Sequence, residues 1–173
     1  MGVEINFDHT KFIITDEQTI NVVGTQNGLP VNGPINFAAT NGFHYYLNNG
    51  ANFLLFNFVK RWNFFGDSSK YFKLDAIGKV GVGPVIPHVD NEFYGNQNKP
   101  RFQFGGWNTG IEAVVRATFY KRVYLEYCNK IDYASYSNLK VYQGTARQNF
   151  TTYEMIMNLG VTFPIGAKII NKL

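Results

Sequence analysis

Eleven ionisable side chains fall on one face of the candidate strands, and these residues are the ones best placed to do chemistry. Each lies beside apolar neighbours, as Glu112 does between Ile111 and Ala113. Such period-two alternation is typical of a strand that separates a polar medium from an apolar one. The acids and bases nearly balance. The set comprises Glu4, Asp8, Arg61, Lys73, Asp75, Lys79, Glu112, Arg116, Glu126, Lys130 and Glu154.

Carboxylates gathered in this way can act as a general acid and base, bind a metal, or pair with Lys and Arg. Carboxylates that must be buried are more often paired than catalytic, so the pattern favours ion pairs. The sequence has no His-Glu-x-x-His spacing and no nucleophile elbow. We therefore predict no metal and no cofactor, map no catalytic residue, and find that the pattern leans against an enzyme.

If the apolar medium beside the strands is lipid, three basic residues near strand ends are candidates for contacts at the edge of the membrane. His9 shares its strand face with Ile5 and Phe7, and Lys11 follows it. This pair is suited either to a lipid phosphate or simply to the polar boundary. His88 follows Pro87, where the alternatives are a hydrogen bond that orders a loop and a site residue.

Composition bounds the class of protein. The 173 residues are 45% hydrophobic and 16% charged, which suits one domain, and the mean hydropathy is -0.18. No run approaches the ~20 apolar residues that a spanning helix needs. The single cysteine, Cys128, excludes an internal disulfide framework. The net charge of +4 comes from scattered basic residues, so we predict no nucleic-acid partner; anionic lipid near a membrane rim would attract the same groups.

Six strands are predicted, and the connections between them alternate between long and short. The long connection at residues 15–48 contains a possible hairpin of residues 19–23 with 34–39, and residues 132–150 form a polar loop. Glu112 and Arg116 are also spaced for a helix over 110–130, but the aromatic and β-branched residues there favour strands. The predicted strands cover 3–13, 52–62, 72–82, 107–117, 123–130 and 153–163.

Alternating connection lengths are typical of outer-membrane barrels. The sequence therefore predicts an all-β fold, an antiparallel up-and-down meander that forms a transmembrane β-barrel as a single domain over residues 1–173. Because an interior of about eight strands is only wide enough for side chains, the eleven charged groups would close the lumen. Aromatic residues at the other end fit an inner girdle: Trp62, Phe64, Phe65, Tyr71 and Tyr120.

Residues 49–62, Asn-Gly-Ala-Asn-Phe-Leu-Leu-Phe-Asn-Phe-Val-Lys-Arg-Trp, resemble a strand of small bacterial outer-membrane barrels of the opacity-protein, OmpA-like porin type. Residues 2–11, 81–90 and 125–127 are similar to the same family, some of whose members are labelled lipid A oxidase-like. The resemblance implies an eight-stranded barrel in the outer membrane of a Gram-negative bacterium. It also implies contacts with lipid and lipopolysaccharide, insertion by the barrel-assembly machinery, and a surface-antigen or envelope role.

Two departures from that family pattern shape the expectations. The family carries a leader and two further strands before the segment that begins here at Gly2, so we expect an N-terminally truncated barrel. Residues 164–173 extend as a tail beyond Phe163, the expected terminal aromatic. Two other functions stay open: a lipid A-modifying enzyme using His9 and His88, and a soluble lipocalin-like carrier with its apolar residues inside.

Overall fold

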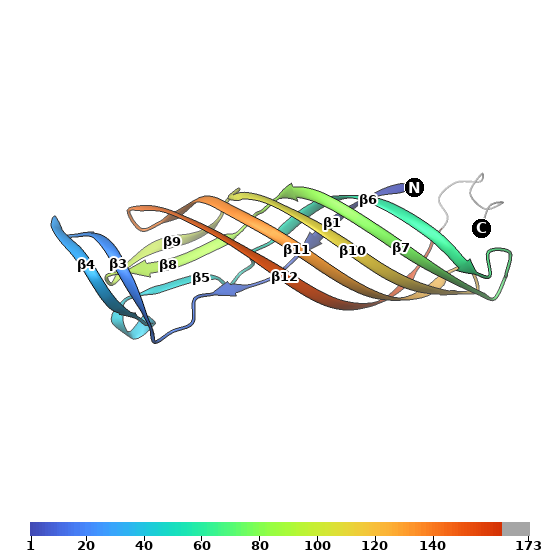
Figure 1. Cartoon of the computed structure of the whole chain (residues 1–173), viewed down its shortest axis with the longest axis horizontal. Coiled ribbons are helices and arrows are strands. Elements are labelled where there is room, and N and C mark those ends of the chain that lie inside the picture. The colour runs from blue at the N-terminus through green and yellow to red at the C-terminus, as the bar shows by residue number, and fades with distance from the viewer. Residues whose placement is uncertain (164–173) are drawn as a thin grey trace.

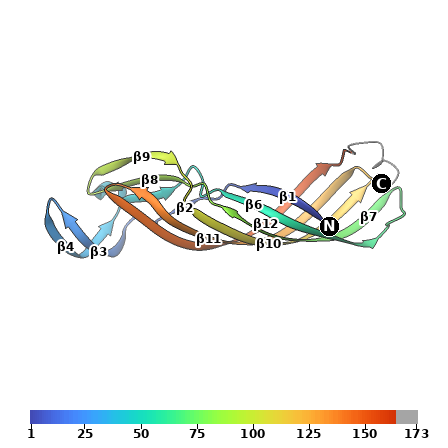
Figure 2. The ribbon, with the colours of Figure 1, turned by 90° about the horizontal axis from the view of Figure 1, so that it is seen from above.

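Antiparallel pairing organises every strand of the computed structural model, which describes residues 1–163. The largest sheet has six strands in the order β1-β6-β7-β10-β11-β12. It curls along its length into half of a barrel (Figures 1 and 2). Its strands are β1 (Gly2–Asp8), β6 (Phe53–Phe65), β7 (Phe72–Pro84), β10 (Gly106–Phe119), β11 (Val123–Val141) and β12 (Gly144–Val161).

Two smaller sheets lie at one end of these long strands (Figure 1). A four-stranded sheet has the order β2-β5-β8-β9, and a separate hairpin pairs β3 with β4. The short 3-10 helix Ala39–Asn41 connects the hairpin to the four-stranded sheet. The bounds are β2 (Phe12–Ile13), β3 (Gln18–Gln26), β4 (Leu29–Phe37), β5 (His44–Leu47), β8 (His88–Phe93) and β9 (Asn96–Phe102).

Tight turns at the opposite end hold the long strands in register. Arg122 N donates to Phe119 O across Tyr120 and Lys121, both of which have positive φ, 49° and 62°. Positive φ at both central residues defines a type I′ turn, whose twist matches that of the strands it joins. The short connections predicted at this end are therefore present.

The all-β antiparallel prediction is confirmed, and the six predicted strands correspond to the six strands of the large sheet. The helix considered over residues 110–130 is wrong, since that segment is the β10–β11 hairpin. The predicted small hairpin exists and is longer than expected, pairing residues 18–26 with 29–37. The predicted tail, residues 164–173, lies outside the described residues.

Two segments differ from the prediction. The first predicted strand, 3–13, is divided into β1 and β2, which belong to different sheets. The polar loop expected at 132–150 is strand almost throughout, because β11 and β12 continue to a turn at Tyr142 and Gln143. A register shift between Tyr136 and Leu139 interrupts the alternation there, which hides the strand pattern in the sequence.

A hydrophobic core lies where the small four-stranded sheet packs against the long strands. Leu47 and Val89 from the small sheet join Phe53 and Leu55 of β6 and Tyr136 of β11, all buried. The Tyr136 and Phe150 rings stack with their centroids 5.4 Å apart. This core fills the space between the small sheet and the long strands at that end of the curled sheet.

Within residues 1–163, no helix combines the length and the apolar character needed to cross a bilayer.

Candidate functional site: two charged tiers on the concave face

The inward side chains of the curled sheet form rows across the strands, and we call this side its concave face. Lys79, Glu112, Lys130 and Glu154 are successive cross-strand partners on β7, β10, β11 and β12. Their signs alternate along the row. Opposite charges directly across a strand pair stabilise a sheet. The register itself thus assembles these charges, although they lie far apart in the sequence.

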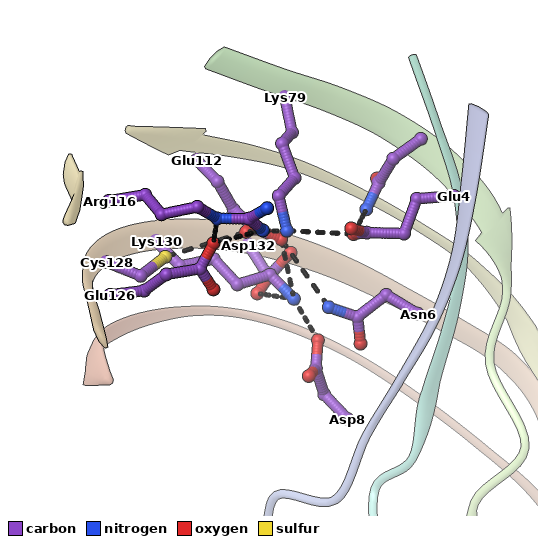
Figure 3. A network of polar contacts seen from close by, with 11 residues as sticks. Glu4, Asn6, Asp8, Lys79, Glu112, Arg116, Glu126, Cys128, Lys130 and Asp132 are labelled. Atoms are coloured by element: carbon purple, nitrogen blue, oxygen red, sulfur yellow. Dashed lines mark hydrogen bonds and ion pairs between the residues drawn. The ribbon is translucent and has the colours of Figure 1, made fainter. Parts of the chain in front are cut away.

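We define the first tier as this row together with the carboxylates beside it. Lys130 contacts Asp8, and its Nζ lies 3.3 Å from Asp132 Oδ2. It also lies 3.8 Å from Glu112 Oε1. Figure 3 shows these groups converging from β1, β10 and β11. The members of the first tier are Glu4, Asp8, Lys79, Glu112, Lys130, Asp132 and Glu154.

Lys79 makes the second centre of the first tier. Its Nζ lies 2.9 Å from Glu4 Oε1 and 3.1 Å from Glu112 Oε2, so it bridges β1 and β10 (Figure 3). Asn57 Nδ2 donates to the same Glu4 oxygen at 3.1 Å. Cys128 Sγ donates to Glu112 Oε2 at 3.5 Å. These neighbours occupy the carboxylate lone pairs and hold Glu112 between the two lysines.

Two adjoining glycines make room for the first tier. Gly81 and Gly110 are cross-strand partners, flanked by Asn57 on β6 and Asp132 on β11. A Cβ atom on Gly81 would lie 1.8 Å from Asn57 Oδ1, and one on Gly110 would lie 1.9 Å from Asp132 Oδ1. No side chain larger than hydrogen fits at either position without displacing these polar groups.

An apolar row separates the first tier from a second one. Ile77, Val114 and Cys128 are buried cross-strand partners, and Val59 and Ile156 pack against them. Because this row is apolar and buried, the ion pairs beside it are screened less than surface pairs would be.

The second tier contains more bases than acids. Arg61 pairs with the fully buried Asp75, and Arg116 pairs with Glu126. Lys73 Nζ lies 3.0 Å from Asp67 in the β6–β7 turn and 3.9 Å from Asp75. The Arg116 guanidinium also lies over the Tyr124 ring, 4.2 Å from its centroid. The members of the second tier are Arg61, Lys73, Asp75, Arg116 and Glu126.

Charge is not balanced in the first tier. Five carboxylates there face only two ammonium groups, which leaves an excess of three negative charges. Glu154 makes no ion pair among residues 1–163, although Asp8, Lys130 and Glu112 are close enough to act on its charge. Asp132 is fully buried, and neither of its carboxylate oxygens accepts a hydrogen bond within the described residues.

The predicted rim residues are placed separately from the tiers. His9 is exposed, and its Nδ1 lies 2.9 Å from Asn52 Oδ1. Lys11 is exposed beside it. The His88 backbone N donates to Gly50 O at 2.9 Å, and its ring packs against Phe102 with centroids 4.8 Å apart. Within residues 1–163, no hydrogen bond or ion pair joins any two of these three residues.

Asp132 is the member of the first tier that sequence reasoning missed. The predicted fifth strand ended at Lys130, and Asp132 was assigned to a loop. The alternation in fact continues, because Ile131 and Tyr133 are exposed while Lys130, Asp132 and Ala134 are buried. Extending the period-two test two residues further would have found it.

A second polar cluster lies on the small four-stranded sheet and involves His44 of β5. Its ring is buried, with Nε2 3.2 Å from Asp90 Oδ1 and Nδ1 3.5 Å from Glu92 Oε2. The Tyr46 ring stacks on it, 4.8 Å between centroids, and Tyr46 OH donates to Asp16 Oδ1 at 3.5 Å. Burial, followed by the charge of Asp16, raises the pKa of Tyr46.

The chemistry of the tiers is that of paired charges. Most of the carboxylates lie within ion-pair distance of a lysine or an arginine, as Glu4 and Glu112 do at Lys79. Within the described residues, no group of three or more His, Cys, Asp or Glu side chains is arranged to hold a metal ion. The concave face therefore carries a network of paired charges, and the first tier keeps an uncompensated negative charge.

Comparison of the chain with protein-family models, with curated proteins and with solved structures gives no match.

Proposed function

We propose that this chain is a β-barrel component of a bacterial outer membrane, with a structural or surface-interaction role and a closed lumen. The observation that carries the proposal is the outward side of the curled sheet, which we call the convex face. Most of its side chains are apolar and exposed, and such side chains occur on all six strands of this sheet. Examples are Ile5, Phe58, Val82, Ile111 and Met157, of which Met157 is 72% exposed.

In water this surface would be costly, because soluble monomers rarely expose continuous apolar patches of such extent. Lipid chains remove that cost. The same strands carry buried charges on the opposite side, where Glu112 is 8% exposed and Lys130 is 1% exposed. An apolar outside and a charged inside is the arrangement of a membrane barrel and the reverse of a soluble one.

Aromatic side chains gather at the turn end of the convex face, as expected for a membrane interface. The rings of Phe72 and Phe119 lie 5.4 Å apart, and those of Tyr71 and Tyr120 lie 6.1 Å apart. Lys60, a charged residue of the convex face, lies over the Trp62 ring at 5.3 Å. An ammonium group resting on an interfacial tryptophan can reach lipid headgroups.

A second aromatic pair marks the other boundary. Trp107 and Tyr133 face outward from β10 and β11, with their ring centroids 5.7 Å apart. Between this pair and the turn-end aromatics, the convex face carries Val80, Ile111 and Val115. The two groups of aromatics thus bracket an apolar band, which supports contact with lipid and lipopolysaccharide.

The soluble carrier considered from the sequence needs the opposite burial pattern. It requires Ile111, Met157 and Val161 inside, with Glu112 and Glu154 outside. The three apolar residues are each at least half exposed, while Glu112 is buried. The burial pattern therefore supports the membrane barrel over the carrier.

The two tryptophans, Trp62 and Trp107, allow a direct test. The refolded protein is bound to phosphatidylcholine vesicles whose acyl chains are brominated at different depths. Single-tryptophan variants Trp62→Phe and Trp107→Phe report each site separately. We expect both indoles to be quenched most strongly by the shallow bromines, with a change in gel mobility between unheated and boiled samples.

The proposal fails if the protein stays monomeric in detergent-free buffer, shows no heat-dependent gel mobility, and has tryptophan emission that lipid bromines leave unchanged.

A further inference from the structure

A small cavity lies at the turn end of the concave face, where the β6–β7 and β10–β11 hairpins meet. Phe119 of β10 is the cross-strand partner of Phe72 of β7, and Tyr120 N donates to Tyr71 O at 2.9 Å, so the two turns are neighbours. The cavity has a volume of about 100 Å³, several times what one water molecule needs. It is therefore large enough for a small polyatomic ion.

Basic side chains from four separate places in the chain line this cavity. Arg61 comes from β6, Lys73 from β7 and Arg116 from β10. Lys121 comes from the turn that follows β10. One carboxylate, that of Asp67, also lines the cavity. The cavity wall is therefore predominantly cationic.

The two arginines keep donors beyond their ion pairs. Arg61 donates to Asp75 through Nη2, and Arg116 donates to Glu126 through Nε. A guanidinium carries five N–H donors in a rigid fork, so pairing with one carboxylate does not use all of them. Each arginine is thus held in place by an acid and can still donate to a second acceptor.

The two lysines are less committed. Lys73 Nζ lies 3.0 Å from Asp67, whose side chain is 76% exposed, and exposed ion pairs are weak. Lys121 is exposed and makes no ion pair within residues 1–163. Four basic groups here face three carboxylates, those of Asp67, Asp75 and Glu126. One positive charge is left over, and Lys121 carries it.

A buried hydroxyl without a partner also lines the cavity. Thr118 is 8% exposed, and its Oγ1 makes no hydrogen bond within the described residues. Leaving such a group unsatisfied costs free energy. The lysine and arginine groups around it have no lone pairs, so the partner that would suit the whole set is a hydrogen-bond acceptor.

The arrangement of these donors indicates the kind of acceptor. They reach the cavity from β6, β7, β10 and a turn, and a planar carboxylate offers only two oxygens to such a set. A phosphate group is tetrahedral and offers three or four. Arginine forks match phosphate oxygens in pairs, and these charge-assisted hydrogen bonds are stronger than neutral ones.

We propose that this cavity binds a phosphate group, held by Arg61, Arg116 and Lys121, with Thr118 Oγ1 donating to one of its oxygens. The group is either free phosphate or the phosphomonoester of a lipid headgroup, which present the same oxygens. The site is formed by the turn end of the sheet alone. It therefore goes beyond the proposed function and does not depend on it.

A titration followed by NMR tests the site. The full chain, labelled with ¹⁵N, is placed in octyl glucoside micelles, whose headgroup carries no phosphate. Inorganic phosphate is added at constant ionic strength, and acetate is added in a parallel sample. We expect saturable shifts of the Thr118 and Lys121 amides with phosphate, and binding of acetate at least about tenfold weaker.

Two threonine variants examine the hydroxyl. Thr118→Val keeps the shape and removes a hydroxyl that has no partner within residues 1–163, so the fold should be retained and phosphate should bind about tenfold more weakly. Thr152→Val is the matched control. The Thr152 hydroxyl is also buried without a partner in that range, but it lies outside the cavity on β12. This variant should bind phosphate as the unmodified chain does.

Two lysine variants separate the site from net charge. Lys121→Gln should weaken phosphate binding about fivefold, because it removes the unpaired cation. Lys70→Gln removes the same charge from the neighbouring β6–β7 turn, where Lys70 is exposed and does not line the cavity. Its effect should stay within about twofold. Equal losses in the two variants would mean that net charge alone attracts the ion, and would overturn the proposal.

Dihexanoyl phosphatidic acid, titrated in the same way, distinguishes the two sources of phosphate. If it shifts the Thr118 and Lys121 amides at lower concentration than inorganic phosphate does, a lipid headgroup is the ligand; if only inorganic phosphate shifts them, the ligand is free phosphate. Either result supports the site. The proposal is overturned if neither compound gives saturable shifts, if acetate binds as well as phosphate, or if the two threonine variants behave alike. A chain that stays soluble without detergent is titrated in buffer alone, so the proposed function can fail while the phosphate site stands.

Discussion

Replacing Lys130 by methionine is the sharpest test of the first tier. Lys130 is 1% exposed and its ammonium group contacts Asp8, Asp132 and Glu112. Methionine keeps much of the side-chain volume but removes the charge. The change leaves three carboxylates without their common partner in a region that already holds too many acids. Removing one partner of a buried ion pair costs about 3–5 kcal/mol.

That cost is large enough to measure as a shift of the unfolding midpoint. With a urea dependence of roughly 2 kcal/mol per molar, the midpoint should fall by about 2 M. The assay is urea unfolding of the micelle-bound protein, followed by tryptophan fluorescence. Lys70→Met is the matched control, because Lys70 is exposed and makes no ion pair within residues 1–163. Its effect should stay within about 0.5 kcal/mol.

A second substitution separates charge from packing. In Lys130→Met combined with Asp132→Asn, one of the stranded carboxylates becomes neutral, so part of the lost stability should return. A double-mutant cycle with Asp132→Asn alone gives the coupling between the two residues. The reasoning is refuted if Lys130→Met costs no more than Lys70→Met, or if the added Asp132→Asn destabilises the protein further.

Three other outcomes follow from the structure. Gly110→Ala places a methyl group against Asp132 and should cost about 1–3 kcal/mol in urea unfolding, whereas Gly24→Ala, with open space around it, should cost much less; similar losses would contradict the close approach. The buried Cys128 thiol should react with a water-soluble thiol reagent only after unfolding, and rapid labelling of the folded protein would argue for a water-filled lumen. The raised pKa of Tyr46 means that the folded state favours the neutral phenol, so its stabilising contribution is present below the ordinary pKa of 10.0 and is lost as the pH rises above it. Tyr46→Phe should remove that part of the alkaline loss in a pH series of unfolding measurements.

Alternation along each strand was readable from the sequence because it depends on neighbouring residues alone. Ile111 and Glu112 fall on opposite faces whatever their strand pairs with, so the sequence predicted the all-β antiparallel sheet and the charged face. The C-terminal half of β11 could not be recognised as a strand from the sequence. The irregularity after Tyr136 shifts its register, and the Ser and Asn residues there are typical of loops. The small strands β8 and β9 were missed for a similar reason, because polar residues dominate β9.

Contacts within the tiers depend on information that no local pattern carries. Asp8 and Lys130 meet although 122 positions separate them, because the sheet curls until β1 lies opposite β11. The sequence places each residue on the inward face, but the register and curvature decide which charges touch. The shortage of bases in the first tier emerged only when the register divided the charges into two tiers, and the placement of Asp132 within β11 enlarged it.

The adjoining pair Gly81 and Gly110 has a consequence for the shape of the sheet. At this position the two neighbouring strands β7 and β10 carry no side chain on the concave face, so the sheet can curl there without a steric clash between side chains. A methyl group at Gly110 would press on Asp132, and we expect the sheet to relieve that contact by opening its curl, which would draw β1 away from β11. The contact of Lys130 with Asp8 thus depends on two residues without side chains, on strands to which neither Lys130 nor Asp8 belongs.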